Sequence, residues 1–218
     1  MTRIYLIRHG ATVLTAEDRF AGSTDVLLSD EGREQFRLLS ERLSRVELAA
    51  VYASPMRRTV ESAEILARPH QLPVTAVEAF REIAHGRWEE RTRAEVEREY
   101  AEEYARWNED PYTFAPAGGE TGLAVTARAL PELLEVVARH QGQRAAIVSH
   151  KATIRLLLSS LLGFDPRRYR EHLDQSPAAL NILDFKDLAH ARLMAFNDTS
   201  HYRAEPEAPK QRLSKVWQ

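Results

Sequence analysis

The chain has 218 residues, a formal net charge of -2 and no cysteine. This length fits one domain, or one domain with a large insertion, and 44% hydrophobic with 28% charged residues is typical of a soluble globular protein. The balanced charge argues against nucleic acid or an anionic membrane as a partner, and the lack of cysteine excludes disulfides and thiolate chemistry. No apolar run suits a signal peptide or a membrane span, so we expect a cytoplasmic protein.

Strand and helix patterns alternate along the first 80 residues. Residues 4–7 form a short apolar run that predicts a buried strand. Ser29 is placed to cap a helix whose apolar residues, from Phe36 to Val46, recur every three or four positions. The next predicted elements are a strand at 48–53, a helix at 57–67 and a strand at 72–80.

Residues 84–118 differ in character from what precedes them. They are rich in Glu, Arg, Trp and Tyr and end in a stretch with several chain breakers, which indicates a helical insertion that caps a site. A further helix is predicted from Glu120 onward, and Pro131 should kink or interrupt it. A strand at 145–148, an apolar helix at 153–162 and a hairpin of 179–185 with 192–197 complete the pattern.

The alternation of strands and helices predicts an α/β fold. We expect a three-layer α/β/α arrangement with a mostly parallel central sheet, an antiparallel edge and a helical cap. One domain should cover residues 1–203 with the cap at about 84–118, followed by a poorly ordered tail at 204–218.

The predicted strand ends carry side chains suited to phosphoryl chemistry. His9 follows the first strand and His150 the strand at 145–148, while Arg58 and Glu82 lie just beyond the second and third strands. The C-terminal ends of parallel strands meet at one edge of a sheet, where ligands bind. Arginine grips phosphate with paired hydrogen bonds, neutral imidazole is a nucleophile near pH 7, and a carboxylic acid can protonate a leaving alkoxide. No tight metal-ligand spacing occurs, so we expect neither a metal nor a cofactor.

The triplet Arg8-His9-Gly10, after an N-terminal strand, resembles the signature of the histidine phosphatase superfamily, which includes the cofactor-dependent phosphoglycerate mutases. Other segments are similar to further motifs of this family, in the family's order, from about residue 3 to 165. These are Asp25, Leu28 and Gly32; Ser54-Pro55-Met56-Arg57-Arg58; Glu82 with Gly86-Arg87-Trp88-Glu89; Gly118-Gly119-Glu120-Thr121; and Val148-Ser149-His150 with Arg155.

The resemblance implies a role for each catalytic candidate. His9 would attack phosphorus, and Arg8, Arg58 and His150 would bind the phosphoryl oxygens. Glu82 would donate a proton to the leaving group and later act as the base for water. These roles agree with those inferred from the residue types.

The chain also departs from the family pattern beside the phosphate. Thr15 stands where the family often has Asn, Ala21 where it often has Gln, and Lys151 where Gly is frequent. Thr15 keeps a hydrogen-bond donor, whereas Ala21 loses one, so a backbone amide near Gly22 is the expected substitute. Lys151 either adds positive charge at the mouth of the site or points to solvent. Thr15, Gly22 and Lys151 therefore join Arg8, Arg58 and His150 as candidate substrate-binding residues.

Two assignments stay open at this point. Arg57, next to Arg58, is an alternative phosphate ligand. His85, three residues after Glu82, either lines the substrate pocket or is a plain cap residue, and we favour the second reading.

The predicted function is that of a metal-independent phosphomonoesterase of the histidine acid phosphatase type, acting on a small phosphorylated metabolite through a phosphohistidine. One alternative is a phosphoglycerate mutase-type phosphotransferase, which needs a second anion site in the cap. Residues 84–118 contain five arginines but neither an adjacent arginine pair nor a proline run, which favours the phosphatase. Another alternative is a non-catalytic phosphate-binding protein, in which a catalytic residue should be lost, and none is. The sequence names neither the physiological substrate nor the oligomeric state.

Overall fold

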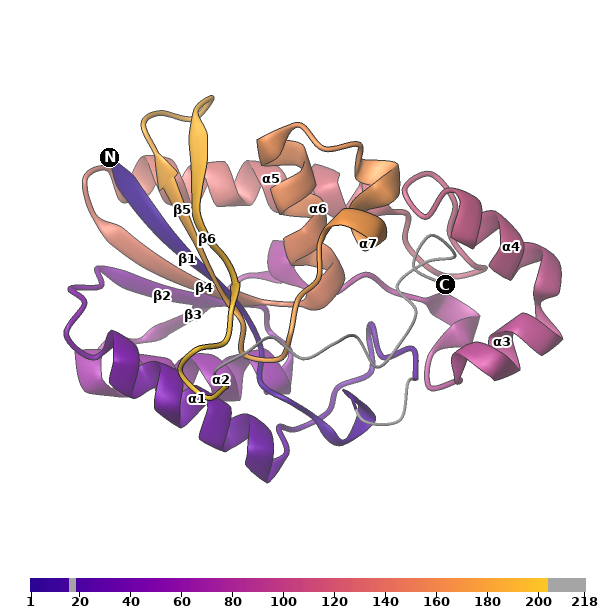
Figure 1. Ribbon diagram of the computed structural model, residues 1–218, viewed down its shortest axis with the longest axis horizontal. Helices are drawn as coiled ribbons and strands as arrows, with labels where there is room; N and C mark the ends of the chain where they lie inside the picture. Colours follow the sequence, from indigo (N-terminus) through magenta and orange to yellow (C-terminus); the bar gives the residue numbers. More distant parts are fainter. Residues whose placement is uncertain (16–18, 204–218) are drawn as a thin grey trace.

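The computed structural model describes residues 1–15 and 19–203, and within them the chain forms a six-stranded sheet of order β3-β2-β4-β1-β5-β6 (Figure 1). The strands are β1 (Thr2–Arg8), β2 (Ala50–Ala53), β3 (Val74–Ala76), β4 (Arg144–Ser149), β5 (Leu180–Phe185) and β6 (Ala191–Asp198). Strands β1 to β4 pair in parallel, whereas β5 and β6 pair antiparallel at one edge. The predicted mostly parallel sheet with an antiparallel edge is therefore confirmed.

Helices cover both faces of this sheet and give the three predicted layers. The helices are α1 (Asp30–Leu43), α2 (Arg57–Ala67), α3 (Arg93–Glu99), α4 (Ala101–Glu109), α5 (Gly122–Arg139), α6 (Lys151–Leu162) and α7 (Tyr169–His172). Helices α1 and α2 lie on one face and α5 and α6 on the other, while α3 and α4 stand apart as the cap (Figure 1). Across residues 1–15 and 19–203, no helix has both the length and the apolar character that a membrane crossing requires.

Strand β1 lies at the centre of the sheet because it is apolar on both sides. Ile4 and Leu6 face the α5–α6 layer, whereas Tyr5 and Ile7 face the α1–α2 layer. Strands buried on both faces read as continuous apolar runs, as residues 4–7 do. Its C-terminal end therefore delivers the following residues to the middle of the sheet edge.

Helix α1 begins where the capping pattern predicted. The Ser29 hydroxyl accepts a hydrogen bond from the amide of Gly32 at 3.1 Å. Asp30 in the first turn adds a favourable negative charge at the N-terminus. The helix packs through the fully buried Phe36 and Leu39, as their spacing predicted.

The prediction of a long third strand at 72–80 was wrong. Strand β3 covers only Val74–Ala76, and the chain then turns into the short 3-10 helix Glu78–Phe80. The strand ends because its neighbour β2 itself ends at Ala53, so no partner remains for further ladder bonds. The apolar residues beyond it, such as the fully buried Phe80, pack into the core from a turn instead.

Of the kink or interruption predicted at Pro131, the interruption does not occur, because α5 runs through it from Gly122 to Arg139. A proline inside a helix removes one hydrogen bond and costs roughly 3 kcal/mol. Ala129 and Leu133, on either side of it, are fully buried against the sheet layer. This packing holds the two halves of α5 together across the missing bond.

The cap has an apolar centre of its own. Phe20, Trp88, Val96 and Trp107 are buried together there.

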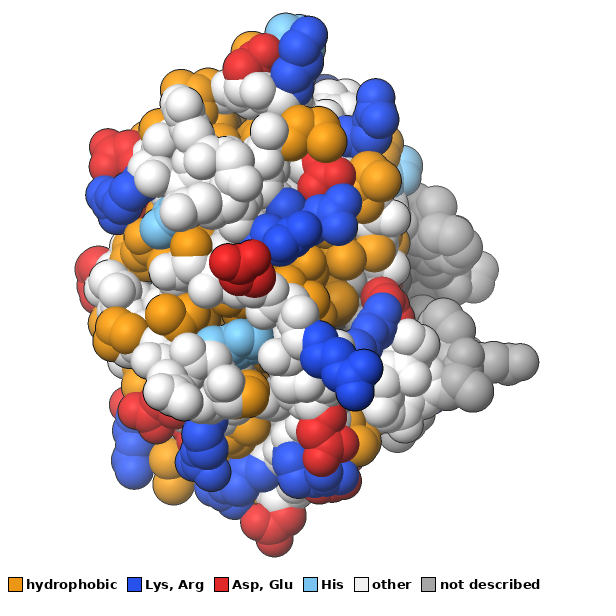
Figure 2. Space-filling model, turned by 90° about the vertical axis from the view of Figure 1, so that its left-hand side faces the viewer, with side chains coloured by type: hydrophobic (Ala, Val, Ile, Leu, Met, Phe, Trp, Pro, Cys, Tyr) orange, Lys and Arg blue, Asp and Glu red, His pale blue; other side chains and the backbone are white. Residues whose placement is uncertain are grey.

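The end of the molecule away from the cap shows Lys and Arg interspersed with Asp and Glu (Figure 2). This distribution agrees with the balanced charge of the sequence.

Candidate active site

Two histidines meet at the C-terminal edge of the sheet. His9 directly follows β1 and His150 directly follows β4, and these strands are parallel neighbours in the sheet. Their ring centroids are 5.2 Å apart with the rings edge-on, and both residues are buried. The structure thus brings together the two histidines that the sequence singled out.

The His9 ring is held in one tautomer. Its Nδ1 lies 2.7 Å from the carbonyl oxygen of Gly10, which can only accept a hydrogen bond, so Nδ1 carries the proton. Burial, together with the charges of Arg58 and Arg8, lowers the pKa of His9 well below its usual value. The ring is therefore neutral at pH 7, with an unprotonated Nε2 available as a nucleophile.

His150 has partners on both ring nitrogens. Its Nδ1 accepts a hydrogen bond from Nε of Arg58 at 3.3 Å, and its Nε2 donates to the Ser54 hydroxyl at 2.8 Å. Burial and the neighbouring Arg58 and His9 lower the pKa of His150 well below its usual value. Nδ1 accepts the Arg58 hydrogen bond and therefore carries no proton. To donate to a phosphoryl oxygen, it has to release Arg58 and become protonated.

Arg8 lies beside His9 at the end of β1 and is buried. One terminal nitrogen of its guanidinium donates to the Gln175 carbonyl at 2.7 Å. Its Nε is buried without a hydrogen-bond partner among the described residues. A buried donor without a partner is costly, and a phosphoryl oxygen would satisfy it.

Arg58, and not Arg57, faces the site. Arg58 is 2% exposed, whereas Arg57 is exposed at the start of α2. The Arg58 guanidinium donates to the carbonyl oxygens of Thr24 at 2.7 Å and Gly22 at 2.9 Å. Gly22 thus presents its carbonyl to Arg58, and the contact of a nearby backbone amide with phosphate stays a prediction.

Glu89 fixes the loop that holds Arg58. Its carboxylate accepts hydrogen bonds from the amides of Ser23 at 3.0 Å and His85 at 2.8 Å. Gly22 lies so close to the segment of Ile83 that a Cβ atom on Gly22 would be 1.9 Å from the Ile83 carbonyl oxygen. The sequence motif contains Glu89, but only the structure shows what it binds.

Glu82 lies at the N-terminus of α6, next to His150. Its Oε1 accepts hydrogen bonds from the amides of Ile83 at 3.0 Å and Thr153 at 3.1 Å, and its Oε2 from the amide of Ala152 at 3.1 Å. The N-cap residue His150 supplies no side-chain cap, so Glu82 serves the free amides of the first turn. These bonds fix the carboxylate on the residues that directly follow His150.

A half-buried arginine of α5, Arg128, holds the loop that carries Glu82. The Arg128 guanidinium donates to the carbonyl oxygens of Ala79 at 2.7 Å, Arg81 at 2.9 Å and Glu82 at 3.2 Å. It also pairs with both oxygens of Glu120 at 3.0 Å each. No sequence pattern had singled out Arg128.

Lys151 and Arg155 share one carboxylate. Lys151 Nζ lies 3.5 Å from Asp174, and a terminal nitrogen of the buried Arg155 lies 2.9 Å from the same oxygen. Burial, with the charges of Arg155 and Arg8, lowers the pKa of Lys151 to about 7. Lys151 thus points toward charged groups beside the site, and Asp174 was missed because nothing in its sequence context marks it.

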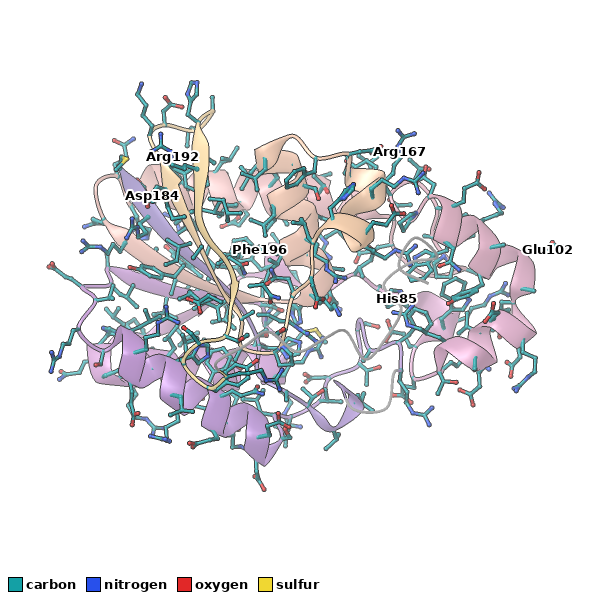
Figure 3. The ribbon with its side chains drawn as sticks, viewed as in Figure 1. His85, Glu102, Arg167, Asp184, Arg192 and Phe196 are labelled. Carbon is teal, nitrogen blue, oxygen red and sulfur yellow. The ribbon has the colours of Figure 1, made fainter. Side chains whose placement is uncertain are left out.

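The remaining candidates lie nearer the cap. Thr15 ends the 3-10 helix Val13–Thr15, and the prediction for its side chain falls outside what the structure describes. His85 lies between the sheet layers and the cap helices (Figure 3). Its ring packs against Phe20 at 4.8 Å and Trp107 at 6.1 Å between centroids, as a cap-packing residue does. Among the described residues, no three His, Asp or Glu side chains are grouped so that they could hold a metal ion.

Comparison with known families identifies one match that spans nearly the whole chain. Residues 4–199 match the model of the histidine phosphatase superfamily (branch 1). Phosphoserine phosphatase 1 of Hydrogenobacter thermophilus is 34% identical over 169 residues, covering 78% of this chain and 80% of the relative. Glucosyl-3-phosphoglycerate phosphatase of Mycolicibacterium vanbaalenii is 32% identical over 168 residues, covering 74% of each chain.

Solved structures give the same result. YhfR of Bacillus stearothermophilus superposes with a TM-score of 0.86 at 30% identity, covering 92% of this chain and 99% of its own. A mycobacterial glucosyl-3-phosphoglycerate phosphatase in complex with VO3 superposes with a TM-score of 0.81 at 27% identity, covering 89% and 98%. The similarity therefore includes both the sheet layers and the cap.

Proposed function

Because the chain belongs to the histidine phosphatase superfamily (branch 1), we propose that it hydrolyses phosphomonoesters through a phosphohistidine on His9. The observation that carries this proposal is the state of His9. The ring is buried and neutral, with Nδ1 bonded to Gly10, Nε2 unprotonated, and the charges of Arg58 and Arg8 lowering its pKa. An unprotonated Nε2 on a ring held in a fixed orientation is the form in which imidazole acts as a nucleophile.

In the first step, Nε2 of His9 forms a bond to phosphorus as the ester P–O bond breaks. Arg8 and Arg58 offset the negative charge of the transferring group. Glu82, once protonated, gives its proton to the leaving oxygen, so the alcohol leaves neutral. His150 donates to a phosphoryl oxygen through Nδ1 once this nitrogen has released the Arg58 Nε–H and taken up a proton from solvent, which the negative charge of the bound phosphate favours.

In the second step, water attacks phosphorus on the face that the alcohol has left. Glu82 is then a carboxylate and takes a proton from this water as the P–N bond breaks. Inorganic phosphate leaves and His9 returns to its neutral form. The hydrogen bonds from the first turn of α6 to Glu82 keep its carboxyl group in place for both transfers.

The proposed reaction needs no metal ion, which fits the histidine acid phosphatase type. Metal-dependent phosphatases gather several carboxylates as ligands. Here Arg8 and Arg58 supply the positive charge instead, and Glu82 is the acid beside the histidines. The proposed substrates are small phosphorylated metabolites, since the relatives are named for phosphoserine, glucosyl-3-phosphoglycerate and adenosylcobalamin/alpha-ribazole phosphatase activities.

A phosphate-release assay on the chelator-treated enzyme tests this proposal. We expect turnover of p-nitrophenyl phosphate and of several metabolites without added metal, and inhibition by vanadate, which mimics the transferring phosphoryl group. Activity that is lost on chelation and restored by magnesium, manganese or zinc would contradict the metal-free mechanism. Conversion of 3- to 2-phosphoglycerate with 2,3-bisphosphoglycerate present, and little phosphate released, would show a mutase instead.

A further inference from the structure

A group of charged side chains lies next to the phosphoryl site and takes no part in the proposed reaction. It consists of Lys151 and Arg155 from α6 and Asp174 from the loop after α7. The next residue of that loop, Gln175, holds Arg8 through its carbonyl oxygen. The group therefore adjoins the phosphoryl site on the side of Arg8.

The same group also adjoins the position of the leaving alcohol. Glu82, the proposed proton donor, marks that position and is bonded to the amides of Ala152 and Thr153. Lys151 is the residue just before them, in the first turn of α6. Arg8 on the sheet side and Arg93 on the cap side both act electrostatically on its ammonium group. Lys151 therefore lies within electrostatic reach of both the phosphoryl site and the cap, beside the place where the organic part of a substrate has to lie.

The charges here do not balance. Two cations, Lys151 and Arg155, share the single carboxylate of Asp174. The two negative charges of a phosphate dianion are taken up by Arg8, Arg58 and the protonated His150, and Glu82 is neutral when it is ready to donate its proton. One positive charge then stays uncompensated beside the leaving group.

Arg155 also has unused hydrogen-bonding capacity. It is 4% exposed, and its Nε has no hydrogen-bond partner among the described residues. A buried, unpaired guanidinium nitrogen is costly, and burial lowers the pKa of Arg155 to about 10. An anionic oxygen that reached this nitrogen would remove the penalty.

We propose that Lys151 and Arg155 form a second anion subsite, which selects phosphomonoesters whose alcohol part carries a carboxylate. This inference rests on the proposed phosphatase function and adds the class of substrate. In the free enzyme the Lys151 ammonium group forms an ion pair with Asp174, and the substrate carboxylate competes with Asp174 for this ammonium group. A neutral alcohol part of the same size leaves the extra charge unpaired.

Two substrates of matched size test the proposal. 3-Phosphoglycerate carries a carboxylate where glycerol 3-phosphate carries a hydroxymethyl group, and the two are otherwise alike. At pH 6, where Lys151 is an ammonium group, the wild-type enzyme should prefer 3-phosphoglycerate by roughly tenfold or more in kcat/KM, since a charge-assisted hydrogen bond commonly contributes this much. Equal use of both substrates, while p-nitrophenyl phosphate is hydrolysed, would overturn the subsite and leave the proposed function intact. No hydrolysis of any of the three would instead contradict the proposed function.

Two variants should shift this preference in opposite directions. Lys151→Gln should lower the ratio of the two kcat/KM values about tenfold, because it removes the charge. Asp174→Asn should raise the ratio, because it removes the competing carboxylate. The matched control is Lys186→Gln, at an exposed lysine in the turn between β5 and β6. If Lys151→Gln changes the ratio no more than the control does, or if both site variants shift it in the same direction, the proposal is wrong.

Discussion

The proposed phosphoryl end of the site and its proposed leaving-group end are built differently. At the phosphoryl end, His9 and His150 follow central strands, and they are buried and anchored by backbone or hydroxyl groups. At the leaving-group end, Lys151 and Asp174 lie half-buried on a helix start and a loop. The first set is fixed by the sheet, so it can serve any phosphomonoester. The second lies on elements that tolerate change, so it can decide which alcohol is accepted.

The largest effect should come from the phosphoryl end. His9→Ala removes the nucleophile and should reduce kcat on the order of 10⁴-fold or more for every substrate. Phosphoryl transfer to His9 is a step that all substrates share, so the loss should not depend on the alcohol part. A loss that differs between substrates would contradict the division of the site into two ends. Steady-state assays with 3-phosphoglycerate, glycerol 3-phosphate and p-nitrophenyl phosphate measure this, and circular dichroism checks that the variant is folded.

A smaller effect, selective for the leaving group, is expected at Glu82. Glu82→Gln cannot supply a proton, which should cost roughly 10²–10⁴-fold for alkyl phosphates. p-Nitrophenyl phosphate should be slowed much less in its first step, because p-nitrophenolate leaves without a proton. Burst kinetics separate phosphorylation from the later attack by water. Equal slowing of the first step for both kinds of substrate would give Glu82 a purely structural role.

Arg128 should act on catalysis through Glu82 without touching the substrate. Arg128→Met releases the loop at three carbonyl oxygens and should lower kcat about 10- to 100-fold, because small misplacements of a catalytic group are costly. The loss should again be greater for alkyl phosphates than for p-nitrophenyl phosphate, and Arg128→Lys should restore part of it. Arg144→Met, at an exposed arginine of β4, is the control. A loss of stability with kcat unchanged for the folded fraction would refute this positioning role.

The smallest effect is a pH dependence confined to the leaving-group end. The lowered pKa of Lys151, about 7, means that its ammonium form is complete only below that pH and is lost above it. The groups that face it are Arg155 of α6, Arg8 of β1, Arg93 of α3 and Asp174. The ratio of kcat/KM for 3-phosphoglycerate over glycerol 3-phosphate should therefore fall severalfold between pH 6 and 8.5. The same ratio in Lys151→Gln should be flat, and a parallel fall in this variant would assign the titration to another group.

Residues fixed by strand ends were accessible from the sequence, because a buried strand has a clear pattern. The apolar run at 4–7 and the strand before His150 placed both histidines at one edge, and the structure brings them together. The extent of β3 was not accessible, since pairing at a sheet edge depends on where the neighbouring strand ends. The uninterrupted course of α5 through Pro131 was not accessible either, because local helix propensity does not include the packing on both sides of the proline.

Long-range hydrogen bonds were beyond sequence reasoning for a different reason. Arg128 reaches Ala79 across 49 positions, and Asp174 meets Lys151 across helices α6 and α7 and the segment between them. Neither pair has a spacing that a pattern could reveal. The bonds that occupy Arg58 and His150 in the free enzyme also follow only from the folded loop at residues 21–24. Sequence reasoning therefore yields the candidate catalytic groups more readily than their partners.

Direct detection of the phosphoenzyme tests the central claim, the transfer of the phosphoryl group to His9. The chelator-treated wild-type enzyme is mixed with 3-phosphoglycerate, quenched within milliseconds, and digested for mass spectrometry under alkaline conditions. We predict one phosphorylated histidine, His9, with a label that is stable to alkali and lost in acid, and no label in His9→Ala. Turnover at the normal rate without a phosphoenzyme, or a label on another residue that persists in His9→Ala, would contradict the mechanism.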